Sequence, residues 1–526
     1  MLLDEPVLHQ SYAAAVPELS VPWQSDVPPA AELVWLNEDL AAELGYDAAW
    51  LRGPEGIALL TGQLAADGRS LAPGSDAPEH PFTTAQAYAG HQFGSANPQL
   101  GDGRAVLLGD LVDTRGDRRD LHLKGAGATP FARAGDGKAP LGPMLREAVV
   151  GESLHALGIP TTRALAVLTT GEQIAPRQGV TPEPGGLLVR AAASHLRVGT
   201  LEYAAWHHDL GVRRALVTHA IERHHPAAEG AASPPLALLE AVMRAQAELM
   251  AQWMLVGFVH GVMNTDNMAL SGEGIDYGPC AFLDVHRRDA VFSSIDRGGR
   301  YAYGHQPGIA LWNLSRCAET LLELVDEGDP NVAVEQATAV LERYEGHYRA
   351  AYARGLAAKL GIPLGAESDR VDSSPTQGEG TAAGGPDPGA DQHLARIQDL
   401  GADLAVLLEE QQVDHTGFFR ALTDADPASL FSDPAPFEAW HQRLLALRGT
   451  GPSAVAAEDA MARTNPVHIP RNVHLDAALR AAHLGDLEPV RTLLEAVRRP
   501  FEHHAEHAHL EGPGDGGEHF MTFCGT

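Results

Sequence analysis

Hydrophobic positions recur with a short period in the first 200 residues of the chain. Short apolar runs between Gly and Pro turns predict strands at 104–112 and 119–124, a turn at 114–117, and strands at VLTTGE and GGLLVRAAA. One helical pattern covers 142–157, where Gly158 and Pro160 follow as stop signals. Residues 1–80 mix Pro-rich extended pieces with short helical patterns such as 30–43.

Beyond residue 200 the apolar spacing becomes helical. The strongest pattern spans 235–259 and is apolar on several faces, which predicts a buried helix. Further helices are predicted at 309–328, 332–360, 393–410, 415–423, 434–448 and 473–498. The segment 366–392 is rich in Gly, Pro, Ser and Asp and poor in apolar residues, so we expect a disordered loop there.

This order of elements predicts an α+β protein with a protein-kinase-like two-lobed fold. We expect a β-rich lobe with Gly-rich nucleotide loops, followed by a helical lobe that carries the catalytic and metal loop. A terminal extension precedes them, and a helical part with a Cys-bearing tail follows the disordered loop. The predicted ranges are 1–80, 81–205, 206–365, 366–392 and 393–526.

Composition excludes several classes of partner. The formal net charge of −31 disfavours nonspecific nucleic-acid binding, because phosphate contacts need Lys and Arg. The chain has no run of apolar residues long enough for a membrane span, and its first 30 residues have no basic region typical of a signal peptide. Three Cys in 526 residues indicate a reducing compartment. We therefore expect a cytoplasmic monomer.

Lysine is scarce in this chain. Lys124, Lys138 and Lys359 are the only three lysines among 38 basic residues. A chain that uses Arg almost everywhere keeps Lys where a compact ammonium group matters. Lys124 ends a predicted strand and Glu147 lies in the next helix, which resembles the Lys–Glu ion pair that positions ATP phosphates in kinases. The alternative is a surface Lys and an unrelated helical Glu.

The stretch HGVMNTDNMALSGEGIDYG carries candidate metal and base residues. In a kinase, H-R-D-x-x-x-x-N supplies the catalytic loop and D-F-G supplies a metal ligand, but Val262 stands here in the slot of the catalytic Asp. Asn267 and Asp276 offer the oxygen ligands that Mg²⁺ prefers. Asp266 is the nearest acid that can accept a proton. The alternative is that this stretch only forms a turn.

Two Gly-rich pieces and two arginines are compatible with phosphate binding. QLGDGR at 99–104 and GDGK at 135–138 allow backbone N–H groups to approach oxygen anions closely. Arg190 and Arg197, on either side of a predicted strand end, can clamp a phosphate or form ion pairs within the lobe. These residues favour a nucleotide site and leave its reaction open.

Longer strings resemble one known family. YAGHQFGSANPQLGDGRA, LHLKGAGATPFARAGDGKAPLGPMLRE, ALGIPTTRAL, HGVMNTDNM and IDYGPCAFLD are similar to the selenoprotein O family, whose bacterial members are also called the YdiU family. NPVHIPRN at 465–472 resembles a later segment of that family. The resemblance implies a protein-kinase-like fold that binds ATP in a reversed orientation and transfers AMP to Ser, Thr or Tyr hydroxyls of proteins.

The resemblance also implies roles for individual residues. Asp266 would be the proton acceptor, Glu147 would pair with Lys124, and Asn267 and Asp276 would hold Mg²⁺, with Mn²⁺ as an alternative ion. Asp276 would also contact the nucleotide. The other implied nucleotide contacts are Gly101, Gly103, Arg104, Lys124, Asp136, Gly137, Arg190 and Arg197.

The cysteines suggest redox control. In the family, the slot of Cys524 holds Cys or selenocysteine, and Cys280 follows Asp276 by four residues. We expect a reversible Cys280–Cys524 disulfide, and a buried thiol at Cys317. Two other functions stay open at this point: a kinase-like phosphotransferase, and a non-catalytic nucleotide-binding pseudokinase, which Val262 would suggest.

Overall fold

An antiparallel sheet forms the N-terminal part of the protein. The computed structural model describes residues 6–71, 75, 78–133, 135–175, 181–364, 388–515 and 520–522. Its largest sheet has seven strands in the order β1-β3-β6-β7-β9-β8-β2. These strands are β1 (Ser20–Pro22), β2 (Glu32–Leu36), β3 (Thr84–Gln86), β6 (Ala105–Val112), β7 (Arg118–Lys124), β8 (Arg163–Ile174) and β9 (Glu183–Ala192).

The side chains of β7 and β9 alternate between two faces of the sheet, one packed on short N-terminal helices and the other covered by α5 (Leu141–Ala156). Leu121, Leu123 and Val189 face a cluster that includes the short helices α2 (Glu38–Glu43), α3 (Ala48–Leu51) and α4 (Pro54–Leu60). Successive strand residues point to opposite faces. His122, Lys124 and Arg190 therefore lie on the other face, the one covered by α5.

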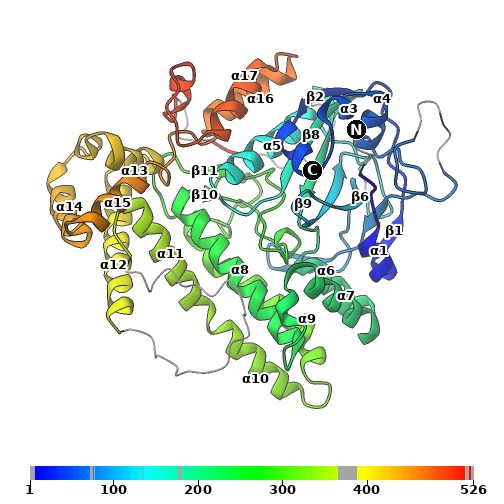
Figure 1. Ribbon diagram of the computed structural model, residues 1–526, viewed down its shortest axis with the longest axis horizontal. Coiled ribbons are helices and arrows are strands. Elements are labelled where there is room, and N and C mark those ends of the chain that lie inside the picture. Colours follow the sequence, from blue (N-terminus) through cyan, green and yellow to red (C-terminus); the bar gives the residue numbers. More distant parts are fainter. Residues whose placement is uncertain are drawn as a thin grey trace.

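A helical part follows the sheet (Figure 1). It is built around the long helix α8 (Pro234–Val256), which packs against α9 (Gln306–Val325), α10 (Pro330–Leu341) and α11 (Tyr344–Leu360). Two further helices, α6 (Val198–His207) and α7 (Leu210–His224), connect the sheet to it. Gly257 ends α8 in a left-handed conformation with φ 74°. The fold is thus α+β, with a sheet lobe and a helical part.

The short ladder after α8 frames the candidate loop. β10 (Phe258–Val259) pairs with β11 (Ala281–Phe282), and the residues between them include Asp266, Asn267 and Asp276. Buried His260 closes the base of this loop, since its Nε2 lies 2.8 Å from the Ile275 carbonyl oxygen. Burial lowers the pKa of His260, so the ring is neutral and Nε2–H donates this bond.

The C-terminal helices form two groups. The helices α12 (Pro388–Glu410), α13 (His415–Asp424), α14 (Pro434–Arg448) and α15 (Pro452–Met461) stand to one side in Figure 1, and α12 to α14 enclose their own cluster of aromatic residues. The helices α16 (Asn472–His483) and α17 (Glu488–Arg498) return across the molecule and pack on α5. The end of the chain thereby supports the helix that carries Glu147.

The NPVHIPRN segment braces β11 as the chain enters α16. The Asn472 side chain accepts a hydrogen bond from the Phe282 N–H at 3.2 Å and donates one to the Phe282 carbonyl oxygen at 2.8 Å. Arg471, buried at 1% exposure, donates to Asp284 at 3.1 Å and to both oxygens of Asp414 at 2.6 and 2.9 Å. A segment remote in sequence therefore fixes the backbone six residues after Asp276.

Most predicted elements are confirmed, with shifts of a few residues at their ends. The prediction of a helix over 30–43 is confirmed only for its last part, α2, and is wrong before it: Asn37 caps α2 by accepting from the Leu40 N–H at 3.2 Å, and the residues before Asn37 form β2. The predicted helix 473–498 is two helices, because Gly485 adopts φ 91° between them. The predicted helix 332–360 is also two helices, α10 and α11, separated by a turn at 342–343.

Most of the predicted loop 366–392 lies outside the described residues, and helix α12 begins at Pro388, five residues before the predicted start of 393. In the part of the chain that the structure describes, no helix combines the length and the apolar character needed to cross a membrane.

Replacing Arg471 by Met tests the brace. The substitution leaves the Asp284 and Asp414 carboxylates without their cation, and breaking one side of a buried ion pair costs about 3–5 kcal/mol. We expect a loss of that size in the free energy of unfolding measured with urea. Arg480→Met is the control: its side chain is 73% exposed, so about 0.5 kcal/mol is expected. Equal losses of unfolding free energy in the two variants would contradict a stabilising role for the Arg471 ion pairs.

Candidate active site

A cleft of about 980 Å³ lies between the sheet and the loop that follows α8. Its walls come from β7, β9, α5, the two Gly-rich pieces and the β10–β11 connection. The predicted residues that line it are Gly101, Gly103, Arg104, Lys124, Asp136, Gly137, Glu147, Arg190, Arg197, Asp266, Asn267 and Asp276. Cys280 is buried beside the cleft and does not line it.

A knot of five charged side chains occupies the floor of the cleft. Lys124 Nζ donates to Glu147 at 2.6 Å and to Asp276 Oδ1 at 2.8 Å. Arg190 donates to the same two carboxylates, at 2.8 Å each. Arg197 reaches Asp276 Oδ2 at 3.3 Å. We call these five residues the charge knot. The pairing predicted for Lys124 and Glu147 is present.

The charge knot holds its acids ionised. Burial alone would raise the pKa of Asp276, but Lys124, Arg190 and Arg197 outweigh it and hold that pKa well below its usual range. Burial likewise opposes ionisation of Glu147, and Lys124 and Arg190 lower its pKa nonetheless. Three cations therefore face two carboxylates, and one positive charge is in excess. This excess makes the floor of the cleft suited to an anion.

Asp276 has an unusual backbone. Its φ is 65°, in the left-handed region that few residues other than Gly adopt. Such a conformation costs about 1–3 kcal/mol and persists where the surroundings enforce it. Here the cations of the charge knot and the His260–Ile275 bond hold the residue on both sides.

Asn267 and Asp276 present oxygen donors to the cleft. Asn267 lies in the short turn Thr265–Asn267, where its amide nitrogen donates to the Val262 carbonyl oxygen at 2.8 Å and leaves its Oδ1 available. An amide oxygen and a carboxylate suit Mg²⁺, which commonly takes one or two protein ligands beside phosphates and water. The described residues contain no group of three or more His, Cys, Asp or Glu placed to bind a metal. The donor set fits an ion held jointly with a phosphate ligand.

Asp266 lies on the wall of the cleft with one oxygen unused. Its Oδ2 accepts from Gln92 at 3.1 Å, whereas its buried Oδ1 has no hydrogen-bond partner in the described residues. Burial raises the pKa of Asp266 to about 6. Gly90 permits this packing, because a Cβ there would lie 2.6 Å from Oδ1. A buried, unpartnered carboxylate oxygen with such a pKa suits a general base near neutral pH.

Sequence reasoning missed the residues that hold Asp266 in place. Thr265 donates to Glu202 at 2.6 Å and accepts from the His91 N–H at 2.6 Å. The His91 ring lies 2.5 Å from the other oxygen of Glu202. Arg197 donates to the Asp266 carbonyl oxygen at 2.7 Å. The string GHQ at 90–92 was part of the family resemblance. Its distance along the chain from Glu202 gave no indication that His91 and Glu202 are in contact.

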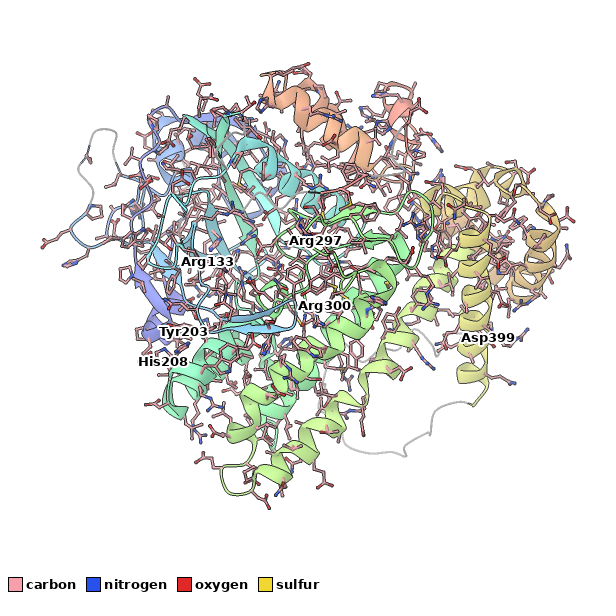
Figure 2. The ribbon with its side chains drawn as sticks, turned by 180° about the vertical axis from the view of Figure 1, so that it is seen from behind. Arg133, Tyr203, His208, Arg297, Arg300 and Asp399 are labelled. Carbon is pink, nitrogen blue, oxygen red and sulfur yellow. The ribbon has the colours of Figure 1, made fainter. Side chains whose placement is uncertain are left out.

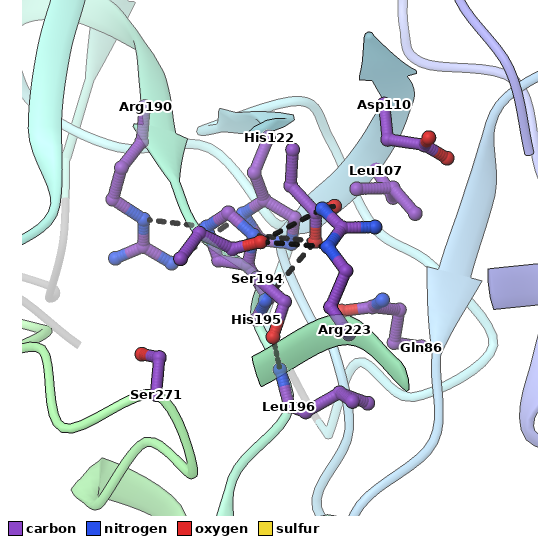
Figure 3. A network of polar contacts seen from close by, with 12 residues as sticks. Gln86, Leu107, Asp110, His122, Arg190, Ser194, His195, Leu196, Arg223 and Ser271 are labelled. Atoms are coloured by element: carbon purple, nitrogen blue, oxygen red, sulfur yellow. Dashed lines mark hydrogen bonds and ion pairs between the residues drawn. The ribbon is translucent and has the colours of Figure 1, made fainter. Parts of the chain in front are cut away.

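A histidine pair behind Arg190 was also missed (Figure 3). His122 and His195 stack at 4.2 Å, and Arg190 Nε donates to His195 Nε2 at 3.3 Å. Burial and neighbouring cations hold the pKa of His195 well below its usual value, so the ring is neutral and accepts this bond. Its Nδ1 then donates to Asp120 at 3.3 Å. The histidine pair holds the Arg190 guanidinium group in position in the cleft.

The Gly-rich pieces form the outer wall of the cleft. Gly101 has φ 78° and lies against the Phe131 ring, where a Cβ would be 2.4 Å from a ring carbon. Asp136 is exposed and accepts from the Lys138 N–H at 3.0 Å. Lys138 itself pairs with Asp26 at 3.0 Å and Glu172 at 3.1 Å. Exposed Arg133, not predicted, also lines the cleft.

The cysteine predictions are tested only in part. Cys280 is fully buried, its Sγ lies 3.0 Å from the Tyr277 carbonyl oxygen, and burial raises its thiol pKa to about 12. Cys317 is buried in α9, as predicted. Cys524 lies outside the described residues. Two residues before it, Thr522 donates to the Pro279 carbonyl oxygen at 2.6 Å, so the tail docks one residue from Cys280.

Comparisons with known proteins agree with the resemblance found in the sequence. The family described as "Protein adenylyltransferase SelO" matches residues 8–498. The chain belongs to the SelO family. It is 49% identical over 522 residues to the protein nucleotidyltransferase YdiU of Mycobacterium sp. (strain KMS), covering 98% of each chain. It is 49% identical over 529 residues to the protein of that name from Mycolicibacterium smegmatis, covering 99% of this chain and 98% of that one.

A less similar relative also aligns with this chain over nearly the full length of both proteins. The protein nucleotidyltransferase YdiU of Cereibacter sphaeroides (strain ATCC 17023) is 46% identical over 527 residues, with 98% of each chain covered. The likeness thus includes both the sheet lobe and the C-terminal helices, and all the residues of the charge knot lie within the matched range.

Asp276→Asn tests the charge balance of the knot. The substitution removes one carboxylate charge and leaves three cations against Glu147. A unit charge at 4 Å is worth about 4 kcal/mol at an effective dielectric of 20, so metal-free inorganic pyrophosphate should bind at least about tenfold more tightly. Isothermal titration calorimetry in EDTA measures this affinity. Asp117→Asn, in an exposed turn, is the control, and weaker binding by Asp276→Asn would contradict the account.

Proposed function

We propose that the protein transfers AMP from ATP to Ser, Thr or Tyr hydroxyls of other proteins and releases pyrophosphate. Family membership supports the nucleotidyl transfer and the protein acceptor. The single observation that carries the proposal is the joint presence, in one cleft, of a cation-rich floor and a buried carboxylate with a free oxygen. The first suits the phosphates of a nucleotide, and the second suits the removal of a proton from a hydroxyl.

The proposed fold is protein-kinase-like. Three features support it: a Lys at the end of a strand paired with a Glu on the next helix of the sheet lobe, a loop ending in Asn267, and an Asp-Tyr-Gly triplet at 276–278. Val262 lines the cleft in the slot of the kinase base. The predicted division at residues 80, 205 and 365, a monomeric state and a cytoplasmic location remain part of this proposal.

The charge knot would receive the triphosphate chain. Lys124, Arg190 and Arg197 would exchange part of their contact with Asp276 for phosphate oxygens. Arg104 and the Gly-rich pieces with Gly101, Gly103, Asp136 and Gly137 would enclose the outer end of the nucleotide. In the reversed orientation implied by the resemblance, the cations of the knot bind the outgoing pyrophosphate.

Asn267 and Asp276 would hold Mg²⁺, with Mn²⁺ as an alternative. The ion would add positive charge beside the α-phosphate, where negative charge develops during transfer. The release of Asp276 from the cations of the charge knot would make its oxygens available. Asp276 is already ionised before that release, because those cations depress its pKa in the charge knot.

Asp266 would act as the base. The acceptor oxygen forms a bond to the α-phosphorus, the bond from that phosphorus to the bridging oxygen of the pyrophosphate breaks, and the hydroxyl proton passes to the Asp266 carboxylate. Gln92, Arg197 and Thr265 keep this carboxylate in place through the contacts described above. The residues missed by sequence reasoning therefore act as its supports.

Differently labelled ATP tests the reaction. Incubation of the protein with Mg²⁺ and ATP should place α-phosphate label, and no γ-phosphate label, on protein. Mass spectrometry should find the added mass of one AMP, which Asp276→Ala abolishes. Label from the γ-phosphate alone would instead favour the kinase-like phosphotransferase. Absence of both labels from the wild type would favour the non-catalytic pseudokinase.

The pH dependence of transfer tests the base. Because the pKa of Asp266 is raised to about 6 and the base must be ionised, the rate should fall tenfold per pH unit below about pH 6 and level off above it. Gln92→Met removes a hydrogen bond that lowers this pKa, so the inflection should move to higher pH. An unmoved inflection in Gln92→Met would assign it to another group.

The Cys280–Cys524 disulfide stays a prediction. The docking of Thr522 at Pro279 supports it by bringing the tail close to Cys280. The burial of Cys280 opposes it, since its high pKa disfavours the reactive thiolate. Peptide mapping without reductant decides between these two effects.

A further inference from the structure

One side of the cleft mouth is formed by two segments next to Asp266. The first is the hairpin of β4 (Gly90–Gln92) and β5 (Ser95–Asn97), whose Gln92 and Phe93 line the cleft. The second is the loop 293–300, whose Ile295 lines it as well. Neither segment belongs to the charge knot. Both line the same cleft as Asp266, the proposed acceptor of the hydroxyl proton.

The backbone of Phe93, at the tip of the hairpin, is held by hydrogen bonds although the Phe93 side chain is exposed. Phe93 has φ 52°, and its N–H donates to Asn264 Oδ1 at 3.1 Å and to the Tyr301 hydroxyl at 3.0 Å. Two acceptors thus hold a backbone conformation that is costly for Phe. Phe93 nevertheless remains 39% exposed. The fold maintains an aromatic side chain at the cleft mouth that its own core does not cover.

The loop 293–300 is equally well fixed. Asp296 is buried and accepts from the N–H groups of Arg300 at 2.9 Å and Tyr301 at 2.8 Å. The tail adds a bond, since the Ser294 N–H donates to the Thr522 carbonyl oxygen at 2.9 Å. Ile295 is 46% exposed on this fixed backbone. A second apolar side chain is therefore presented at the mouth of the cleft.

Two arginines on this loop have no acidic partner. Within the described parts of the chain, no carboxylate lies within ion-pair distance of Arg297 or Arg300, although the chain carries a net charge of −31. Arg297 is exposed, and the Arg300 guanidinium lies over the Trp312 ring at 4.8 Å. A Cβ added at Gly94 would be 3.4 Å from the Arg300 guanidinium carbon, so hairpin and loop meet. Figure 2 shows both arginines on this face.

We propose that Phe93, Ile295, Arg297 and Arg300 form a docking surface for the acceptor segment of a protein substrate. The segment carries acidic side chains beside its hydroxyl residue and an apolar side chain that packs on Phe93 and Ile295. The arginines supply charge complementarity, which steers an acidic segment to the cleft and opposes a basic one. This inference rests on the proposed transfer of AMP and adds the class of acceptor.

Three synthetic peptides test the surface. They share one Thr and one Leu and differ only in flanking residues, which are Glu, Gln or Lys. With α-labelled ATP, kcat/KM should be about tenfold higher for the Glu peptide than for the Gln peptide and lowest for the Lys peptide, since each exposed pair contributes up to about 1 kcal/mol. Added salt should reduce this preference, because exposed charges are screened.

The double variant Arg297→Glu with Arg300→Glu should reverse the order of the peptides while KM for ATP stays unchanged. Arg463→Glu, at another exposed arginine without an acidic partner in the described residues, should keep the wild-type order. Thermal melting of each variant verifies folding. Equal kcat/KM for the three peptides, or a Glu preference that survives the reversal, would overturn the proposed surface.

The same experiment distinguishes a failure of the proposed AMP transfer from a failure of the proposed docking surface. A wild-type protein that transfers AMP to no peptide and no protein, itself included, would refute the proposed function. A wild-type protein that labels itself or other proteins but ignores the peptides, or does not discriminate among them, would refute only the acidic docking surface.

Discussion

The sharing of Glu147 and Asp276 by Lys124, Arg190 and Arg197 is the interaction on which the rest of the structure depends. It joins β7, α5, β9 and the loop after α8 at one point, with contacts between 2.6 and 3.3 Å. Buried ions that lose one partner are strongly destabilising, so these elements hold one another in position. The same contacts leave one positive charge in excess. The feature that joins the two parts of the protein is therefore also the feature that makes the cleft attractive to phosphate.

The supports around this point come from distant parts of the chain. Arg471 and Asn472 hold β11, Thr522 contacts Pro279, and α16 and α17 pack on the helix that carries Glu147. The histidine pair behind Arg190 and the Glu202–Thr265 contact beside Asp266 have the same effect at shorter range. A site that must place several charges within a few tenths of an ångström needs such support, because each charged side chain is long and has many rotamers.

The particular elements show why local pattern succeeded in some places and failed in others. The strands β6 and β7 and the helix α5 were predictable because their apolar period is regular and turn residues bound them. The first half of the helix predicted over 30–43 failed because a consecutive Leu-Val-Trp run fits a strand or a helix equally well, and the helix starts only after the Asn37 cap. The helix predicted over 473–498 failed because one glycine was not taken as a break. In both cases a single backbone position outweighed the average pattern.

By itself the sequence determined the α+β class, the family and the chemical types at the site: a rare Lys, an Asn and an Asp with oxygen ligands, and Asp266 beside them. Those properties belong to single residues and to short spacings, so they can be read without a fold. Only the tertiary structure decided that Asp276 is shared by three cations, that Asp266 is buried with one free oxygen, and that Gly94 and Arg300 meet beside the cleft. These properties depend on contacts between residues that are 79 to 206 positions apart, for which the linear sequence has no local signal.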